Sequence, residues 1–426
     1  MMTRLLPWAL AALLAGCSRQ GSPRERVTDA GADAAATATG RAEAGPPLPS
    51  TPATVPEEEA ATPGRAVMSF AMDVHRTWRA NEARRGKTAA LSPLSLAGGL
   101  ALLHAGARGE TRDELAHALH LSSHVAAADM LKLETRGTAG FEVSRGQRVF
   151  ADGTLAVTPE YRNEMGAAFA LLNFRNPENA RGEINRWTMR VTHGHIPELL
   201  GPGSVDAETQ LVLVDALFAA ARWATRFDPA RTRPQSFTTL GGSVESLPMM
   251  VGESMQRFTR AKAYDAVDLA CADGEHALLV IVPAPGHFDE VDGALDMVGF
   301  DRIVASLSPG RVVVAMPRFR AALRATSIVP ELRALGITRA FDEGANLEGI
   351  TRDPKARLRV GDAVHAATID VDETGAVAAA ATAVVIAPPA PTPPTPSITL
   401  DRPFLFWLRN VRTGAPIVMG RFMGGP

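Results

Sequence analysis

Four side chains near residue 120 have types and spacing that could bind a metal ion. They are Asp113, His117, His120 and His124, and carboxylates and imidazoles are common zinc ligands. Because residues three or four apart share one face of a helix, a continuous helix would bring the four together. The sequence Leu121-Ser122-Ser123 favours a helix end before His124, so we expect a solvated face instead. We therefore predict no bound metal and no other cofactor.

No motif in the chain indicates nucleophilic or metal-assisted catalysis. The sequence contains no G-x-S-x-G, H-E-x-x-H, C-x-x-C, G-x-x-x-x-G-K-[ST] or S-x-x-K pattern. Arg412-Thr413-Gly414 is similar to the K-T-G of penicillin-recognising enzymes, but without S-x-x-K it is typical of a turn. His193 and His195 flank Gly194 and are expected to be surface polar residues. We predict that the protein is not an enzyme.

Composition narrows the possible partners. The 426 residues include 44 basic and 46 acidic side chains, so the net charge gives no reason to expect nucleic acid binding. A hydrophobic content of 46% is ample for a large core. Length alone would suggest two or three domains of about 150 residues each. No run after residue 17 is long and apolar enough to span a bilayer.

The first 17 residues read as a targeting segment. Arg4 precedes an apolar run over residues 5–14, and Leu14-Ala15-Gly16-Cys17 resembles a bacterial lipobox. We therefore expect Cys17 to be lipidated and to anchor the protein to a membrane; an ordinary signal peptide is the alternative. Ser18 lacks the acidic character of an inner-membrane retention signal. This favours an extracytoplasmic position in the cell envelope, at the outer membrane or cell surface.

Residues 18–64 are predicted to form a disordered tether. They are rich in Ala, Pro and Thr and contain no aromatic side chain, so they cannot bury enough apolar area to fold. A flexible chain of this length has a root-mean-square reach of about 35 to 40 Å. A trimmed propeptide is the alternative. Cys271 is then a lone thiol, so we expect no intrachain disulfide and a structural role for this residue.

Hydrophobic periodicity indicates both helices and buried strands in the remaining chain. Val67, Phe70, Val74 and Trp78 recur at helical spacing, and Pro93 after Ser92 is a typical helix start. Residues 211–218 form a nearly continuous apolar run, which is typical of a strand buried on both faces. Residues 277–282 and 312–316 have the same character.

The segment over residues 364–408 has the features of a strand followed by a hinge and a second potential strand. Residues 364–372 alternate with the period of a strand, and Glu373-Thr374-Gly375 supplies a hinge at which glycine tolerates unusual torsions. Small residues occupy 376–381, and no side chain with a polar group larger than a hydroxyl lies between Gly375 and Pro388. Such a segment could slide between two strands without burying an unpaired charge. Pro388 and Pro389 would stop it.

This hinge, the alanine run and the later Leu400-Asp401-Arg402-Pro403-Phe404 resemble the C-terminal third of a serpin. Further matches lie upstream in family order, across residues 65–424. They are Leu91-Ser92-Pro93-Leu94-Ser95-Leu96, Gly106-Ala107-Arg108-Gly109-Glu110-Thr111, Ile184-Asn185-Arg186-Trp187 with Thr192-His193-Gly194-His195-Ile196-Pro197, Leu247-Pro248-Met249-Met250 and Met316-Pro317-Arg318-Phe319.

The resemblance implies an α+β fold in one domain over residues 65–426. A serpin has a large central β-sheet, two smaller sheets, about eight to nine helices and an exposed reactive-centre loop, here at about residues 373–400. A monomer is expected. The stretch over residues 121–150 is short and lacks a basic stripe, so we predict no heparin binding.

The resemblance also assigns two groups of residues that control opening of the central sheet. Ser92, Ser95, Asp215 and His365 match a polar cluster beneath the strands that open, although the family usually has Asn at the position of Asp215. An Asp–His pair there could make opening depend on pH. At the top of the sheet, Trp223 and Arg318 match the region of first insertion, where Arg318 is expected to hold Glu373. The hinge residues are Glu373, Gly375, Ala376, Val377, Ala378, Ala379, Ala380 and Ala381.

The implied function is covalent suicide inhibition of serine proteases, or of papain-like cysteine proteases. The nucleophile of the protease would attack the loop, and the freed loop would insert as a new central strand before the acyl-enzyme is hydrolysed. Strand alternation predicts that the residues turned to the core are Ala376, Ala378, Ala380, Thr382, Val384 and Ile386. The alternative is a non-inhibitory serpin scaffold that acts as a binding or chaperone-like surface module.

Two counts give different positions for the scissile bond. Counting forward from Glu373 gives Pro389-Ala390, whereas counting back from Pro403 gives Thr392-Pro393, which most serine proteases would cut poorly. Pro389-Ala390 is therefore preferred. Ile386-Ala387 and Val385-Ile386 are alternatives suited to an elastase- or subtilisin-like target.

Overall fold

The computed structural model describes residues 62–81, 86–133, 137–353, 355–375 and 395–425. The first described helix, α2 (Pro63–Ala80), begins two residues before the domain boundary predicted at residue 65. Thr62 causes this early start, because its side chain accepts a hydrogen bond from the Arg65 backbone N–H and Pro63 occupies the first turn. In the described residues no helix is long and apolar enough to cross a membrane. Cys17 lies outside them.

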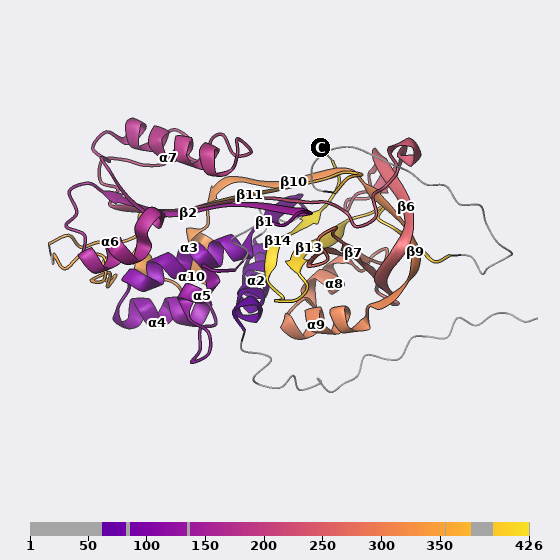
Figure 1. The fold of residues 1–426 in the computed structure, drawn as a ribbon, viewed down its shortest axis with the longest axis horizontal. Helices are drawn as coiled ribbons and strands as arrows, with labels where there is room; N and C mark the ends of the chain where they lie inside the picture. Colours follow the sequence, from indigo (N-terminus) through magenta and orange to yellow (C-terminus); the bar gives the residue numbers. More distant parts are fainter. Residues whose placement is uncertain (1–61, 82–85, 134–136, 354, 376–394, 426) are drawn as a thin grey trace, which may run out of the picture. The chain divides into compact units, whose positions relative to one another are not determined.

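A five-stranded sheet carries the segments that matter most for function (Figure 1). Its order is β10 (Phe319–Ser327), β11 (Asp362–Val371), β4 (Leu211–Ala221), β2 (Phe141–Asp152) and β3 (Phe169–Leu172). β11 pairs with β4 in parallel, and β2 pairs with β3 in parallel, whereas the other two pairings are antiparallel. β4 is buried along its whole length, as its apolar run predicts.

The remaining strands form one nine-stranded sheet, where the sequence predicts two smaller ones. The main path runs β1 (Ala89–Leu91), β14 (Pro416–Phe422), β13 (Phe404–Asn410), β8 (His276–Pro283), β7 (Tyr264–Ala270), β6 (Val244–Arg260), β9 (Ser308–Pro317) and β12 (Ser397–Thr399), while β5 (Arg233–Thr238) pairs with β6. The two smaller sheets join because β6 is 17 residues long. Its first part pairs with β5 and β9, and its last four residues pair with β7.

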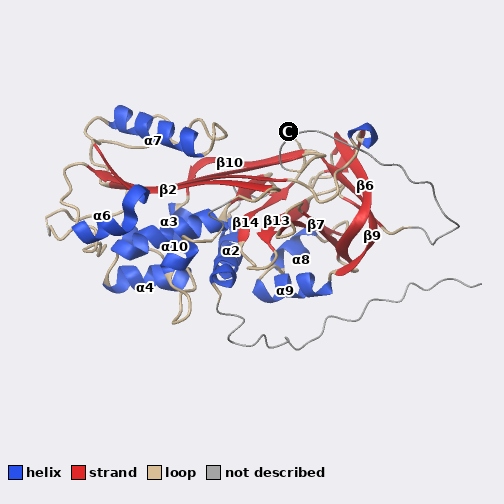
Figure 2. Cartoon of the chain, viewed as in Figure 1, coloured by secondary structure: helices blue, strands red, loops and turns tan. Residues whose placement is uncertain are grey.

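Helices cover both faces of the five-stranded sheet (Figure 2). Nine α-helices, α2 to α10, lie within the described ranges, which agrees with the α+β class and helix number expected. The others are α3 (Pro93–Gly106), α4 (Gly109–Ala118), α5 (Ala127–Met130), α6 (Pro159–Met165), α7 (Pro177–Val191), α8 (Phe288–Gly293), α9 (Met297–Ser306) and α10 (Val329–Ala334). α7 lies on one face of the sheet, and α3 lies on the other.

Alternate residues of β4 belong to two different hydrophobic cores. Leu211, Leu213 and Leu217 face the main core on the α3 side. Val212 and Val214 face a smaller core, which includes Ala180, Ile184 and Trp187 of α7. The central strand is therefore buried on both faces, and any new strand beside it would also present alternate residues to the two cores.

Candidate functional site

The parallel pair of β4 and β11 forms a seam in the five-stranded sheet. Residues 212–218 of β4 pair with residues 362–368 of β11, and the last pair is Phe218 with Thr368. Both strands continue for three residues beyond this pair, to Ala221 and Val371. The ladder between them thus ends before the strands do. Parallel pairing is also slightly less stable per residue than antiparallel pairing, so this seam is weaker than the antiparallel pairings on either side of it.

A tight turn over residues 372–375 ends β11. The carboxylate of Asp372 accepts hydrogen bonds from the backbone N–H and the hydroxyl of Thr374, at 2.8 and 2.7 Å. The Asp372 N–H donates to the carbonyl of Gly375 at 2.9 Å. This is the local bonding by which aspartate stabilises turns. As a result, the chain reverses its direction directly after β11.

Gly375 brings the reversed chain alongside the end of β4. It forms an antiparallel bridge with Arg222 and has a φ of +132°. A Cβ atom at this position would lie 1.9 Å from the carbonyl oxygen of Ala221. Only glycine satisfies both this torsion and this close approach. The hinge predicted at Glu373-Thr374-Gly375 is therefore held against β4 by its glycine.

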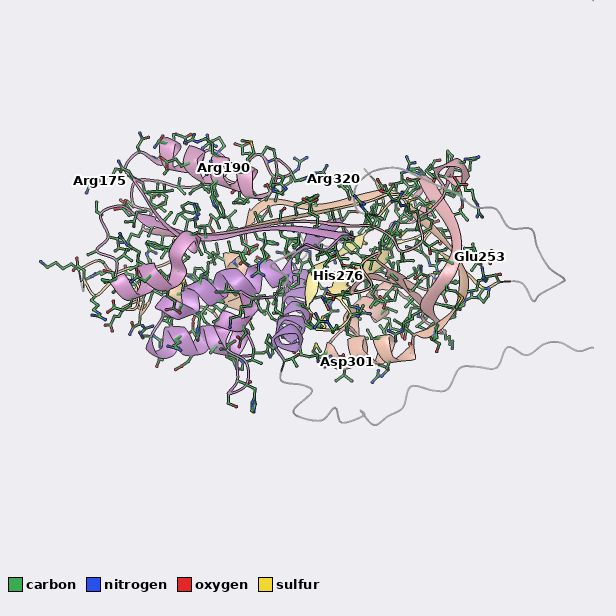
Figure 3. All side chains as sticks on the ribbon, in the orientation of Figure 1. Arg175, Arg190, Glu253, His276, Asp301 and Arg320 are labelled. Atoms are coloured by element: carbon green, nitrogen blue, oxygen red, sulfur yellow. The ribbon has the colours of Figure 1, made fainter. Side chains whose placement is uncertain are left out.

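Glu373 anchors the turn through its buried side chain. Its side chain is 6% exposed and accepts hydrogen bonds from Nε of Arg318 at 2.7 and 2.8 Å. The hydroxyl of Thr232 donates to the same carboxylate. Burial opposes ionisation, but the bonds from Arg318 and Thr232 outweigh it and hold the pKa of Glu373 below its usual value. Nearby on β10, Arg320, which is labelled in Figure 3, forms a more exposed ion pair with Asp370 at 3.5 Å.

Trp223 packs directly beneath the turn. Its indole Nε1 donates to the carbonyl of Asp372 at 2.8 Å, and its backbone N–H donates to the carbonyl of Thr374 at 3.0 Å. The Phe227 N–H donates to the carbonyl of Glu373 at 2.9 Å. The structure thus brings Trp223, Arg318 and Glu373 together. Phe227 and Thr232 join them, and Thr232 has no local sequence signal, since it lies 141 residues from Glu373.

A buried polar cluster lies lower on the seam. His365 and Asp215 are opposite each other in the parallel ladder, and Nδ1 of His365 lies 2.7 Å from Oδ1 of Asp215. The N–H of Ser92 donates to Nε2 of His365 at 3.1 Å. Because Nε2 accepts a hydrogen bond, the proton is on Nδ1 and is donated to Asp215, so the imidazole is neutral in this arrangement.

Two polar atoms of this cluster lack hydrogen-bond partners in the described residues. Asp215 is 2% exposed, yet its Oδ2 has no hydrogen-bond partner in the described part of the chain. The Ser95 N–H donates to the hydroxyl of Ser92 at 3.1 Å, which caps α3, but the hydroxyl of Ser95 likewise has no partner there. The structure therefore brings Ser92, Asp215 and His365 into direct contact and places Ser95 one turn away.

The other predicted site residues lie outside the described residues. This applies to the hinge beyond Gly375, to the candidate scissile bonds and to the lipidation site; the residues are Cys17, Ala376, Val377, Ala378, Ala379, Ala380, Ala381, Val385, Ile386, Ala387, Pro389 and Ala390. The chain is described again from Thr395, and β12 pairs in parallel with β9. The predicted loop thus leaves one sheet and ends in the other.

The candidate metal ligands do not converge. α4 ends at Ala118, before the serines that were expected to stop it, and His120 pairs with Asp73 at 2.8 Å. Among the described side chains, no group of three or more His, Cys, Asp or Glu could hold a metal ion. Cys271 is 1% exposed, and burial, with help from Asp273 and Asp268, raises the pKa of its thiol to about 12. It is an inert core residue.

His195 has a structural contact that the sequence did not indicate. Its ring stacks on Phe218, with ring centroids 3.4 Å apart and an interplanar angle of 6°. Phe218 is the last paired residue of β4 in the seam. His195 therefore covers the point at which the ladder ends, whereas the flanking His193 is exposed beside Glu142, as expected of a surface residue.

The architecture and the hinge define the class of the protein. The structure of uncleaved ovalbumin superimposes with a TM-score of 0.76, at 23% sequence identity, over 86% of this chain and 100% of that one. The model of the family described as "Serpin (serine protease inhibitor)" matches residues 65–424. The chain belongs to the serpin family.

Two curated relatives show the extent of the sequence likeness. Antithrombin-III of Mus musculus is 29% identical over 349 residues, which cover 78% of this chain and 75% of the relative. Serpin B9 of Homo sapiens is 29% identical over 348 residues, which cover 78% of this chain and 91% of the relative.

Proposed function

We propose that this protein is a covalent inhibitor of serine proteases, or of papain-like cysteine proteases, that traps its target by inserting its own cleaved loop into the seam. The family description supports a protease inhibitor. The observation that carries the proposal is the position of Gly375, which already pairs antiparallel with both Arg222 and Asp372. A chain extended from Gly375 along both of these pairings would enter the gap between β4 and β11.

Extending this pairing gives a register for the inserted strand. Antiparallel continuation from Gly375 puts Ala376 opposite Ala221 and Val371, and puts Ala379 opposite Phe218 and Thr368. Phe218 and Thr368 are themselves partners across the present seam, so the two extrapolations agree. Residue 376 and each second residue after it would face the main core with Ala219, Leu217 and Leu213. This is the alternation that the sequence predicts.

The same register brings Thr382 to the buried polar cluster. It would lie opposite both Asp215 and His365, on the same face of the sheet. The Oδ2 atom of Asp215 lacks a partner in the described structure, and a threonine hydroxyl is a donor. Insertion would therefore place the Thr382 hydroxyl where it could donate a hydrogen bond to Oδ2 of Asp215.

The free energy of insertion is sufficient to deform a protease. One parallel ladder would be replaced by two antiparallel ladders, and about ten additional hydrogen bonds at ~1 kcal/mol each are worth on the order of 10 kcal/mol. The acyl-enzyme forms when the nucleophile of the protease attacks the carbonyl of the scissile bond. Movement of the loop would then drag the bound protease away and distort the groups needed for deacylation.

The target and the location complete the proposal. Cleavage at Pro389-Ala390, or at Ile386-Ala387 or Val385-Ile386, fits an elastase- or subtilisin-like protease. A lipid at Cys17 and a tether that ends at Thr62, where α2 is capped, would present the inhibitor at the outer membrane or cell surface.

The decisive experiment is incubation of the mature protein with an elastase- and a subtilisin-like protease. We expect a band that survives SDS, a released C-terminal peptide whose first residue gives the scissile bond, and a cleaved protein that unfolds at a higher temperature than the uncut one. Simple turnover with no stable band and no gain in thermal stability would refute inhibition. That outcome would favour the non-inhibitory binding or chaperone-like role.

A further inference from the structure

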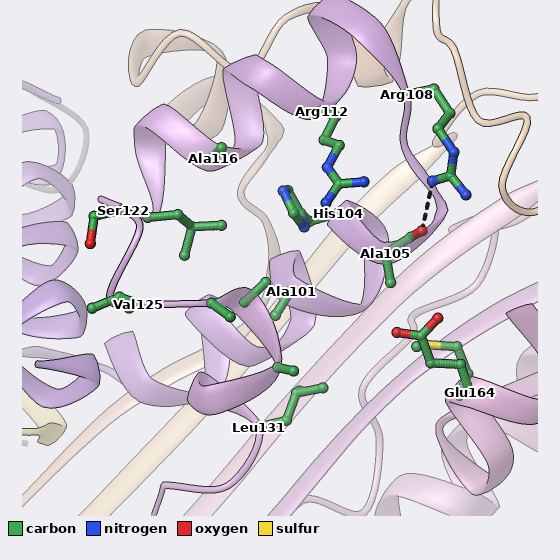
Figure 4. A pocket seen from close by; sticks show the side chains of 15 residues that line it. Ala101, His104, Ala105, Arg108, Arg112, Ala116, Ser122, Val125, Leu131 and Glu164 are labelled. Carbon is green, nitrogen blue, oxygen red and sulfur yellow. Dashed lines mark hydrogen bonds between the residues drawn. The ribbon is translucent and has the colours of Figure 1, made fainter.

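A cavity of about 630 Å³ lies between helices α3, α4, α5 and α6 (Figure 4). One part of its wall is apolar and includes Ala101, Leu121, Val125, Leu131 and Met165. The volume falls in the range of ordinary small-molecule sites, which combine an apolar lining with a few convergent polar groups. It lies away from the hinge and from the polar cluster of the seam, so the inhibitory mechanism does not use it.

His104 is a polar residue of the cavity lining. The residue is 7% exposed, but its ring nitrogens are not among the buried side-chain atoms that lack a partner in the described residues. They therefore open onto the cavity, where a polar group of a ligand could form the hydrogen bonds that a largely buried imidazole favours. Burial and the positive charges of Arg112 and Arg108 lower the pKa of His104 to about 4. The negative charge of Asp113 acts in the opposite direction but is weaker. The ring is therefore neutral near pH 7 and can donate a hydrogen bond.

Two arginines supply positive charge beside His104. Arg112 extends from α4 toward His104, and its guanidinium has no partner in the described structure (Figure 4). Arg108 donates from Nη1 to the carbonyls of Ala105 and Ala107, at 2.9 and 2.7 Å. Glu164 lies across the cavity. With two cationic and one anionic side chain and a neutral imidazole, the lining favours a singly charged anion.

We propose that this cavity binds a small organic carboxylate with an apolar tail. The carboxylate accepts hydrogen bonds from the guanidinium of Arg112 and from the imidazole of His104. A guanidinium can donate two parallel hydrogen bonds to a carboxylate, and a neutral imidazole can donate one. The tail packs along Leu121, Val125 and Leu131. A dianion such as inorganic phosphate fits less well, because it would leave net negative charge in the site and the apolar wall uncovered. This inference stands whether or not the protein inhibits a protease.

The test measures the binding of octanoate, the probe, to the mature protein. Calorimetry and thermal unfolding report the binding. We expect saturable binding of octanoate and a raised unfolding temperature. Octanol, which has the tail without the charge, and acetate, which has the charge without the tail, should each bind at least about tenfold more weakly, a difference of ~1.4 kcal/mol. Binding of inorganic phosphate as tight as that of octanoate would overturn the proposal in favour of a simple anion site.

Variants locate the site. Arg112→Gln and His104→Gln should each weaken octanoate binding by at least about tenfold, whereas Arg324→Gln, which removes the same charge from an exposed position on β10, should leave it unchanged. The imidazole NMR signals of His104 should also shift on titration in the parent protein and not in Arg112→Gln. Arg112 is exposed, so its loss should not prevent folding. Equal binding by the parent and both cavity variants, or no saturable binding at all, would show that the cavity holds only water.

Discussion

Asp215 is the most unusual residue of the seam, because it puts a carboxylate in a position that is 2% exposed. Its Oδ1 accepts a hydrogen bond from Nδ1 of His365, and its Oδ2 is buried without a partner in the described structure. A buried group with an unsatisfied oxygen costs free energy, and a charged one costs more than an amide. The seam is therefore weakened at the position where the proposed strand would supply Thr382.

Asp215→Asn should stabilise the uncut protein. The amide oxygen can still accept from Nδ1 of His365, while the buried negative charge is removed, so we expect a gain of about 1 kcal/mol in the free energy of unfolding at pH 7. Chemical denaturation measures it. Asp370→Asn, on the neighbouring strand but 34% exposed, should change stability by less than about 0.5 kcal/mol. A clear loss of stability in Asp215→Asn would mean that the charge itself is needed, and that His365 is a cation.

Glu373 should make the anchored turn sensitive to acid. The pKa of Glu373 is lower in the folded protein than its ordinary value of 4.5. Its contribution to stability is therefore fully present above pH 4.5 and is lost as the pH falls through the folded pKa. Glu373→Gln should therefore be less stable than the parent near pH 7. The difference in unfolding temperature should shrink progressively below about pH 4.5. A difference that is constant from neutral to acid pH would show that charge plays no part in the anchor.

At the scale of elements, the inserted strand can be tested by a pair of neighbouring substitutions. Ala376→Arg would push a guanidinium into the main core beside Ala221, where an unpaired charge costs several kcal/mol. Cleavage of the loop lies a dozen or so residues away and should be unaffected. The variant should therefore turn from inhibitor to substrate, with the same cleavage site but no SDS-stable complex.

Val377→Arg is the matched control. In the register extended from Gly375 it faces the opposite side of the sheet, next to Asp370, so most trapping should be kept. Loss of trapping in Val377→Arg with retention in Ala376→Arg would put the register off by one residue. Equal trapping by the parent and both variants would mean that inhibition does not use insertion.

Elements with strong periodicity could be predicted from the sequence, and elements defined by long-range pairing could not. The burial of β4 follows from its apolar run, and the start of α3 follows from Ser92 and Pro93. The fusion of the two smaller sheets depends on β6 pairing with different partners along its length, for which its local sequence holds no signal. In the candidate site, the family motifs identified Arg318 and His365. Thr232, His195 and the register of Gly375 depend on contacts between distant segments, so no local pattern could reveal them.

At the scale of the whole molecule, the proposed lipid at Cys17 is expected to hold the protein at a membrane. Cys17→Ala should release the protein from membranes into the soluble fraction, because the tether has too little apolar area to bind a bilayer alone. Fractionation of envelopes followed by immunodetection measures this, and the purified variant should inhibit as well as the parent. Continued sedimentation of Cys17→Ala with membranes would show that another part of the chain provides the anchor.

The parallel seam also has a consequence for how the chain folds. Asp215 and His365 are 150 residues apart in the sequence. The edge of β4 that β11 covers therefore stays unpaired until this distant strand reaches it. Closing so large a loop is slow, whereas the turn over residues 372–375 closes within four residues. A folding chain can thus pair β11 with the segment that follows it sooner than it can pair β11 with β4. In the native protein β11 pairs with β4 instead. The interval before that docking is when the chain is most exposed to pairing with its own loop or with the loop of a second copy.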